Sequence, residues 1–286
     1  MAGLQPASDI LDLIAATPAD ADPQVWGDHL GSLLYLDEVY RPDPARREAF
    51  RTFARAKVAP VFARVGWEAR AGEPEPVINL RNNLIETLGT LGDADVVAEA
   101  RRRYLAQASD PAALPPALRR IVLGVVAEHA DAATWERMHA AARAETSPLL
   151  KGTWYELLAR PADAMLARRA LDLALTDEPG ATTTADMIDY VSVQHPDLAF
   201  DFALADRDKL MARLEPGVHV RFYPGLATGS LDAAMVGKLQ AYAREHIEEA
   251  LRRDTDTAIA NIEYRRRIHD ERLPLLDAWL QAHAAR

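Results

Sequence analysis

A leucine stripe that ends in a glycine–aspartate turn is the feature that most limits the folds open to this chain. Between residues 79 and 105, leucines recur at the three- and four-residue steps of one helix face: Leu80, Leu84, Leu88 and Leu91. Gly92 is expected to end this helix, because glycine adopts the left-handed cap conformation at little cost. Asp93 is then expected to cap a second helix by accepting its free N–H groups. The stretch therefore predicts a two-helix hairpin that needs neighbours to bury its apolar faces.

The same pattern recurs along the middle of the chain. The aspartates expected to cap the second helix of each hairpin are separated by 38 and then 32 residues: Asp93, Asp131 and Asp163. The expected first helices begin near Asn79, Pro115 and Ser147. A two-helix repeat of about 35 residues is typical of solenoid arrays. The sequence therefore predicts an all-α chain, folded as a right-handed α-solenoid or superhelix of HEAT- or armadillo-like antiparallel helix pairs.

We expect this solenoid to form a single domain over residues 1–286. Within it, we expect leading helices in 1–70, the most regular helix pairs in 71–176, and less regular closing helices in 177–286. Two places are expected to depart from regular helix. The stretch Phe222–Gly229 is interpreted as an irregular, partly apolar loop, and Pro274 is expected to break or kink a long helix predicted over 256–280.

The charge and composition argue against two classes of partner. The net charge of -10 and the pI near 5.3 disfavour nucleic acid, whose phosphates usually need a basic face. The chain contains no apolar run long enough to span a bilayer, so we expect no membrane partner. Cysteine is absent and the first residues lack the features of a secretion signal. These observations predict a cytoplasmic location.

The motifs of common catalytic centres are missing from the chain. No two of the eight histidines lie four residues apart, so there is no H-E-x-x-H zinc helix. There is also no glycine-rich phosphate loop after a strand and no G-x-S-x-G nucleophile turn. We therefore assign no catalytic residue, no metal ligand and no cofactor to this chain.

Several segments of the chain have a recognisable order and spacing: Gly66-Trp67, the Leu91-Gly92-Asp93 turn, HPDLAFDFA from His195, and the ending AIANIEYRRRIHDERLPLLDAWL. Together they resemble the C-terminal domain of the aminopeptidase N family of zinc metallopeptidases, the group that includes the puromycin-sensitive and ER aminopeptidases. The resemblance extends over essentially the whole chain. It implies a helical, non-catalytic domain that closes over a catalytic domain, walls a substrate chamber and limits the access of peptides.

The same resemblance implies which partners and cofactor the complete enzyme would have. The family's zinc helix and its G-x-M-E-N loop do not occur here, so zinc is expected in a catalytic domain outside this chain. The expected partners are that catalytic domain and peptide substrates, and the activity is release of N-terminal residues. An alternative also stays open: a free-standing α-solenoid that binds another protein along its groove, because a fold alone does not define a function.

The resemblance also suggests candidate substrate-binding residues. ER aminopeptidases carry a Leu-Tyr-Lys stretch that contacts the far end of the peptide; Leu34-Tyr35 matches it, but Leu36 replaces the lysine. Tyr35 is therefore a candidate, with packing between helices as the alternative. The cations that are candidates to face the same chamber are Arg81, Lys151, Arg169 and Arg265, and exposure on an outer surface is the alternative for each of them.

Overall fold

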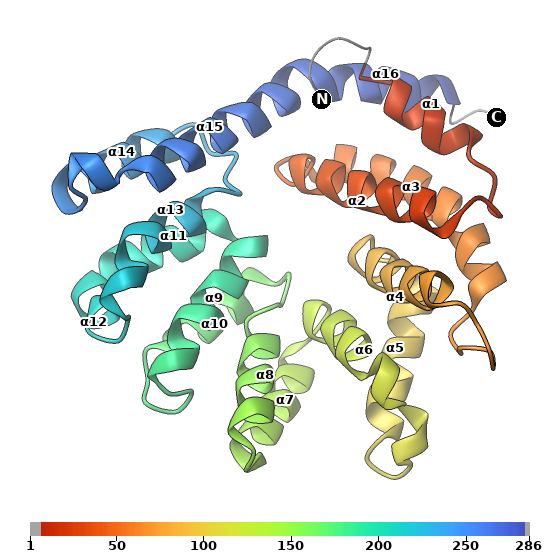
Figure 1. Cartoon of the computed structure of the whole chain (residues 1–286), viewed down its shortest axis with the longest axis horizontal. Coiled ribbons are helices and arrows are strands. Elements are labelled where there is room, and N and C mark those ends of the chain that lie inside the picture. The colour runs from red at the N-terminus through yellow and green to blue at the C-terminus, as the bar shows by residue number, and fades with distance from the viewer. Residues whose placement is uncertain (1–6, 284–286) are drawn as a thin grey trace. The chain divides into compact units, whose positions relative to one another are not determined.

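The protein is all-α, as predicted. The computed structural model describes residues 7–283 and contains no strand among them (Figure 1). The helices form two compact units, which we describe separately: residues 7–126 with 267–283, and residues 127–266. None of the described helices combines the length and the apolar character needed to cross a membrane. The prediction of a single domain and that of a right-handed superhelix stay predictions.

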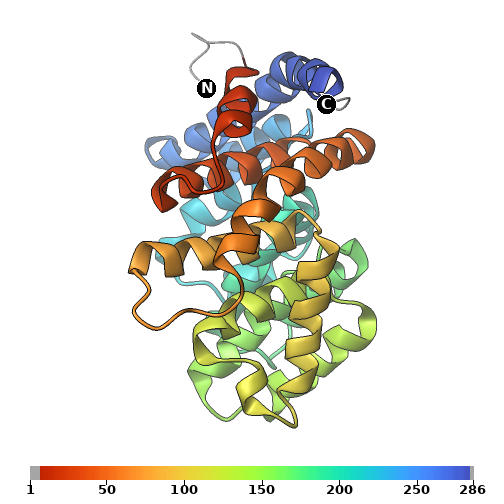
Figure 2. The same cartoon turned by 90° about the vertical axis from the view of Figure 1, so that its right-hand side faces the viewer.

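The first unit contains the N-terminal helices and the C-terminal one. Its helices are α1 (Asp9–Ala16), α2 (Pro23–Val39), α3 (Pro44–Val65), α4 (Glu75–Thr90), α5 (Ala94–Ala106), α6 (Pro116–Glu128) and α16 (Leu273–His283). Helix α4 packs on both α2 and α3, and α16 packs on α3. Figure 2 shows the loop that joins α3 to α4. Buried side chains from these helices form the core of the unit, among them Trp26, Leu33, Phe50, Leu84 and Leu88.

The predicted hairpin of α4 and α5 is confirmed in atomic detail. Gly92 has a φ of 74°, the left-handed conformation that ends α4. Its N–H donates to the Gly89 carbonyl and the N–H of Asp93 donates to the Leu88 carbonyl, both at 2.9 Å, which is the Schellman arrangement. The carboxylate of Asp93 then accepts a hydrogen bond from Val96 N at 3.0 Å. Asp93 therefore completes the end of one helix and caps the start of the next.

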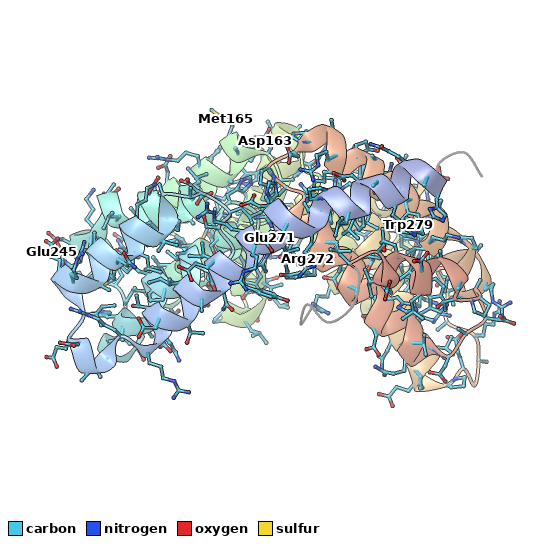
Figure 3. The ribbon with its side chains drawn as sticks, turned by 90° about the horizontal axis from the view of Figure 1, so that it is seen from above. Asp163, Met165, Glu245, Glu271, Arg272 and Trp279 are labelled. Atoms are coloured by element: carbon cyan, nitrogen blue, oxygen red, sulfur yellow. The ribbon has the colours of Figure 1, made fainter. Side chains whose placement is uncertain are left out.

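The second unit repeats this capping. Its helices are α7 (Ala132–Ala144), α8 (Pro148–Leu158), α9 (Ala164–Ala174), α10 (Ala181–Gln194), α11 (Pro196–Ala205), α12 (Arg207–Met211), α13 (His219–Ala227), α14 (Met235–His246) and α15 (Arg253–Arg267). Asp131 accepts from Thr134 N at 2.7 Å, which confirms the predicted cap of α7. Asp163 accepts from the N–H groups of Met165 and Leu166 at the start of α9, and Figure 3 labels Asp163 and Met165.

Aromatic side chains with satisfied polar groups stabilise the core of the second unit. Trp135 is buried between α7 and α8, and its indole N–H donates to the Leu158 carbonyl at 3.0 Å. The Tyr223 hydroxyl donates to the Ala203 carbonyl at 2.8 Å, and its ring stacks on Tyr242 with the centroids 4.1 Å apart. Each large ring is thus buried without leaving a polar atom unpaired, as a stable core requires.

The stretch expected to be an irregular loop at Phe222–Gly229 is instead mostly helical, and that expectation was wrong. Helix α13 covers His219–Ala227 and contains Pro224. Pro224 and the nearby glycines suggested a loop, but Phe222, Tyr223 and Leu226 are buried and face the neighbouring helices. Burial of these three side chains outweighs the hydrogen bond that proline removes from the helix.

Near Pro274, where a break or kink was expected, the chain departs from regular α-helix without ending it, in a π-helical turn just before the proline. A π-helical turn, Ile268–Arg272, separates α15 from α16, and Figure 3 labels Glu271 and Arg272 within it. Pro274 has no N–H for the carbonyl four residues earlier and its ring would clash with that carbonyl. The wider π turn relieves both problems, so the chain continues as helix on the far side.

Candidate functional site

Tyr35 lies on α2, beside the leucines that build the core of the first unit. The residue as a whole is half-buried, whereas its hydroxyl oxygen is shielded from solvent. Leu33 and Leu36 on either side are fully buried, so this part of α2 is packed against its neighbours. A peptide would reach the ring edge more readily than the hydroxyl. This placement favours the packing alternative for Tyr35.

Arg81 is buried and ties the loop after α3 to α4. The side chain is 1% exposed, and its guanidinium forms an ion pair with Glu73 at 2.6 Å. Its Nε also donates to the Gly66 carbonyl at 3.0 Å, and Nη2 donates to the Val65 carbonyl at 3.2 Å. The hydrogen bond from Arg81 lowers the pKa of the Glu73 carboxyl below its usual value. Arg81 therefore has a structural role within the first unit.

The other three candidate cations belong to the second unit and are partly or fully exposed. Arg169 on α9 forms an ion pair with Glu136 of α7, and its guanidinium lies 4.2 Å from the centre of the Trp135 ring. Lys151 on α8 and Arg265 on α15 are partly exposed. The described contacts of Arg169 are therefore with its own structural neighbours and not with another member of this set. Exposure leaves all three accessible to a peptide.

A cavity that the sequence analysis did not anticipate lies in the second unit, between α10, α13 and α15. Its volume is about 470 Å³. The lining comprises Ala185, Asp186, Asp189, Val218, Arg221, Phe222, Pro224, Gly225, Thr228, Asp254, Thr257 and Ala258. Helical spacing explains the grouping, because residues three or four apart share one face, as Asp186 and Asp189 do on α10. We call this space the α10–α13–α15 cavity.

Apolar and charged groups occupy different parts of this cavity. Phe222, Pro224 and Ala258 are buried and form its inner wall. Three carboxylates and one guanidinium lie on its exposed side, those of Asp186, Asp189, Asp254 and Arg221. Within the part of the chain that the structure describes, none of these four side chains has a hydrogen-bond or ion-pair partner. The cavity therefore combines an apolar wall with unpaired charges of net negative sign.

The carboxylates on α10 are held in an environment that disfavours their charged form. Burial raises the pKa of the Asp186 carboxyl above its usual value. Burial, and then the charge of Asp186, raise the pKa of Asp189. Glu156 on the adjacent α8 shows the same pattern, because burial and then the charge of Asp186 raise its pKa. A cation placed among these groups would relieve both the desolvation and the mutual repulsion.

A second cavity, in the first unit, differs in character. It has a volume of about 890 Å³, lies between α3 and α16, and is mostly apolar, with Phe53, Trp279 and Leu280 in its lining. Two of its charged lining residues, Arg46 and Asp277, form an ion pair with each other at 2.7 Å, and a third, Lys57, donates to the Ala15 carbonyl at 3.4 Å. Because those charges already have partners, this cavity offers little for recognition of a charged ligand.

Among residues 7–283, no group of three or more histidine and carboxylate side chains is arranged to hold a metal ion. Comparison with known proteins then places these observations in context. The sequence model of a family described as the ERAP1-like C-terminal domain matches residues 1–264. This match covers most of the chain, and it confirms the resemblance that the sequence segments indicated.

Proposed function

Because this chain belongs to the ERAP1-like C-terminal domain family, we propose that it is the non-catalytic helical domain of a zinc aminopeptidase. The observation that carries the proposal is the family match over residues 1–264. The all-α architecture and the lack of a zinc helix in the sequence agree with it. Zinc and the reacting groups would belong to the catalytic domain of the same enzyme, which is the expected partner of this chain.

The finer part of the proposal is that this domain walls the substrate chamber and limits which peptides enter. The partly or fully exposed cations of the second unit, Lys151, Arg169 and Arg265, would contact the peptide carboxylate or its acidic side chains. Each such solvent-exposed ion pair contributes about 1 kcal/mol or less. The isolated chain should accordingly bind an acidic peptide with a dissociation constant no tighter than roughly millimolar. Weak contacts of this kind would guide a peptide without trapping it.

The reading frame upstream of this chain tests the coarser proposal. We expect it to encode the H-E-x-x-H helix and the G-x-M-E-N loop. A frame without them, or aminoacyl hydrolysis by residues 1–286 alone that a chelator abolishes, would overturn it. The first of these results would favour the free-standing scaffold.

The chamber role is tested in the complete enzyme with the combined variant Lys151→Ala, Arg169→Ala and Arg265→Ala. Hydrolysis of a single-residue aminoacyl reporter should be unchanged, because the reporter does not reach this domain. Hydrolysis of peptides of about ten residues should change relative to hydrolysis of shorter peptides, so that the dependence of the rate on peptide length differs from that of the unmodified enzyme. The matched control is Arg102→Ala, an exposed arginine of the first unit that pairs with Glu99. Equal length profiles for the variant, the control and the unmodified enzyme would contradict the chamber role.

A further inference from the structure

We propose that the α10–α13–α15 cavity binds the basic side chain of a peptide, a guanidinium or ammonium group carried on an apolar stem. The inference deepens the proposed function and rests on it for the peptide nature of the ligand. It is independent of the exposed cations discussed above, because the cavity presents the opposite charge. A domain with both features would recognise the positions of basic residues along a peptide in addition to its acidic groups.

The size of the cavity suits an organic side chain. Sites for small organic ligands have volumes of about 300–1,000 Å³, and this one has about 470 Å³. Its buried wall of Phe222, Pro224 and Ala258 would contact the methylene groups of a lysine or arginine stem. Long basic side chains commonly pack their stems on apolar surface while the charged end stays in a polar environment.

The charged groups of the cavity fit the end of such a side chain. Asp186 and Asp189 lie one helical turn apart on α10, and Asp254 faces the same space from α15. These carboxylates have no partner among the described residues, and partial desolvation raises the pKa of the two on α10. A guanidinium with several donors can bridge carboxylates on two helices.

The arrangement favours an organic cation over a metal ion. The three carboxylates belong to no group close enough to hold one ion among the residues that the structure describes. A bare Ca²⁺ or Mg²⁺ needs about six oxygen ligands around a single point, whereas an extended cation can meet separate carboxylates. Arg221, in the same lining, can donate to a peptide carbonyl oxygen.

A buried hydroxyl on α15, outside the lining of the cavity, is also unsatisfied. Thr255 lies on α15 between the lining residues Asp254 and Thr257, and it is 2% exposed. Its hydroxyl oxygen has no hydrogen-bond partner among the described residues. An unpaired buried hydroxyl is unfavourable, but Thr255 does not line the cavity and is not part of the proposed site.

Direct binding to residues 1–286 tests the inference without any catalytic assay. The probe is an N-acetylated, C-amidated pentapeptide with arginine at its centre, and the comparison peptide carries norleucine there. Blocking both ends ensures that neither the amino terminus nor the carboxylate contributes. We expect the arginine peptide to shift NMR signals of α10, α13 and α15 and to bind at least fivefold more tightly than the norleucine peptide, the factor that one ion pair of about 1 kcal/mol supplies.

Substitutions of the residues that line the cavity provide a second test of the inference. Asp186→Asn and Asp254→Asn should each weaken binding of the arginine peptide about fivefold, and Asp189→Lys should abolish it. The matched control is Glu263→Gln, which removes an exposed carboxylate of α15 outside the lining. Circular dichroism would verify that each variant remains helical. Equal affinity for both peptides, shifts outside these three helices, no shifts at millimolar peptide, or the same loss in Glu263→Gln would overturn the inference. None of these results would alter the outcome of the reading-frame and hydrolysis tests of the proposed function.

Discussion

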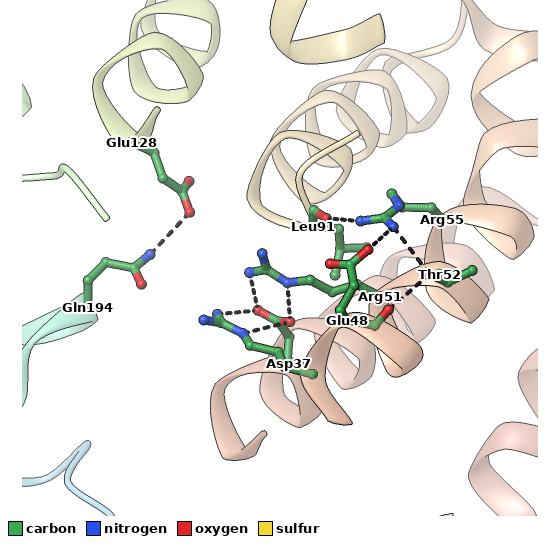
Figure 4. A network of polar contacts seen from close by, with 9 residues as sticks. Asp37, Glu48, Arg51, Thr52, Arg55, Leu91, Glu128 and Gln194 are labelled. Carbon is green, nitrogen blue, oxygen red and sulfur yellow. Dashed lines mark hydrogen bonds and ion pairs between the residues drawn. The ribbon is translucent and has the colours of Figure 1, made fainter. Parts of the chain in front are cut away.

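Asp37 supports a prediction that can be worked through from its contacts. Its side chain is 1% exposed on α2 and receives both Arg47 and Arg51 from α3. Four hydrogen bonds join the groups, from 2.6 to 3.1 Å, with each guanidinium contributing two (Figure 4 shows those around Asp37). Asp37→Asn keeps the shape of this side chain, but it removes the charge and turns an amide donor toward two cations.

The expected loss in the free energy of unfolding of Asp37→Asn follows from how deeply each partner is buried. Removal of one member of a buried ion pair destabilises by about 3–5 kcal/mol. The side chains of Arg47 and Arg51 are 19% and 18% exposed, so water can reach them in the variant, and the lower end applies. We expect a loss of about 3 kcal/mol. For a unit of this size, that corresponds to a fall in the melting temperature of roughly 6–12 °C.

The dependence on pH distinguishes an ion pair from simple packing. Burial acts to raise the pKa of Asp37, but the hydrogen bonds and charges of Arg51 and Arg47 outweigh it and leave the pKa below its usual value. A group whose pKa is lowered on folding stabilises the protein above its unfolded pKa, about 4 for aspartate. That stabilisation is lost as pH falls through the folded pKa. The difference between wild type and Asp37→Asn should thus be constant from pH 5 to 7 and shrink at lower pH.

Thermal and urea unfolding followed by circular dichroism would measure both quantities. The matched control is Asp28→Asn, which removes an exposed carboxylate from the same helix. A surface change of this kind should alter stability by no more than about 0.5 kcal/mol. Equal midpoints for the two variants, or a penalty for Asp37→Asn that persists unchanged well below pH 4, would refute the reasoning.

Three further predictions concern a helix glycine, a helix cap and a buried tyrosine hydroxyl. Gly89→Ala should destabilise by about 1–3 kcal/mol in urea unfolding, because the new Cβ would lie 2.5 Å from Cγ2 of Val125; Gly27→Ala, with open space around it, should be neutral or stabilising. Asp93→Ala should cost about 1 kcal/mol in the same measurement, whereas Asp93→Asn keeps the cap and should cost little. Burial and a neighbouring carboxylate raise the pKa of Tyr155 to about 12. The raised pKa means that the protonated hydroxyl contributes fully to the free energy of unfolding below pH 10, and that this contribution is lost as pH rises toward 12. Tyr155→Phe should abolish that alkaline loss in stability.

The sequence alone determined the helices and most of their ends. Caps such as Asp93 and the turn at Gly92 depend on hydrogen bonds between residues at most five positions apart, so the residues that decide them are adjacent in the chain. The leucine stripe of α4 is equally local, because helical periodicity alone predicts which side chains share a face. Where local signals conflicted, as at Pro224 in α13, burial of neighbouring side chains decided the result and the sequence prediction failed.

The tertiary structure alone decided which charged residues are available for recognition. Arg81 looked like a surface cation, yet the loop before α4 folds back and buries it against Glu73 and two carbonyl groups. The α10–α13–α15 cavity brings together Asp186, Arg221 and Asp254, which are more than thirty residues apart along the chain. No periodicity connects such positions, because their proximity arises from helix packing and not from the geometry of any one helix.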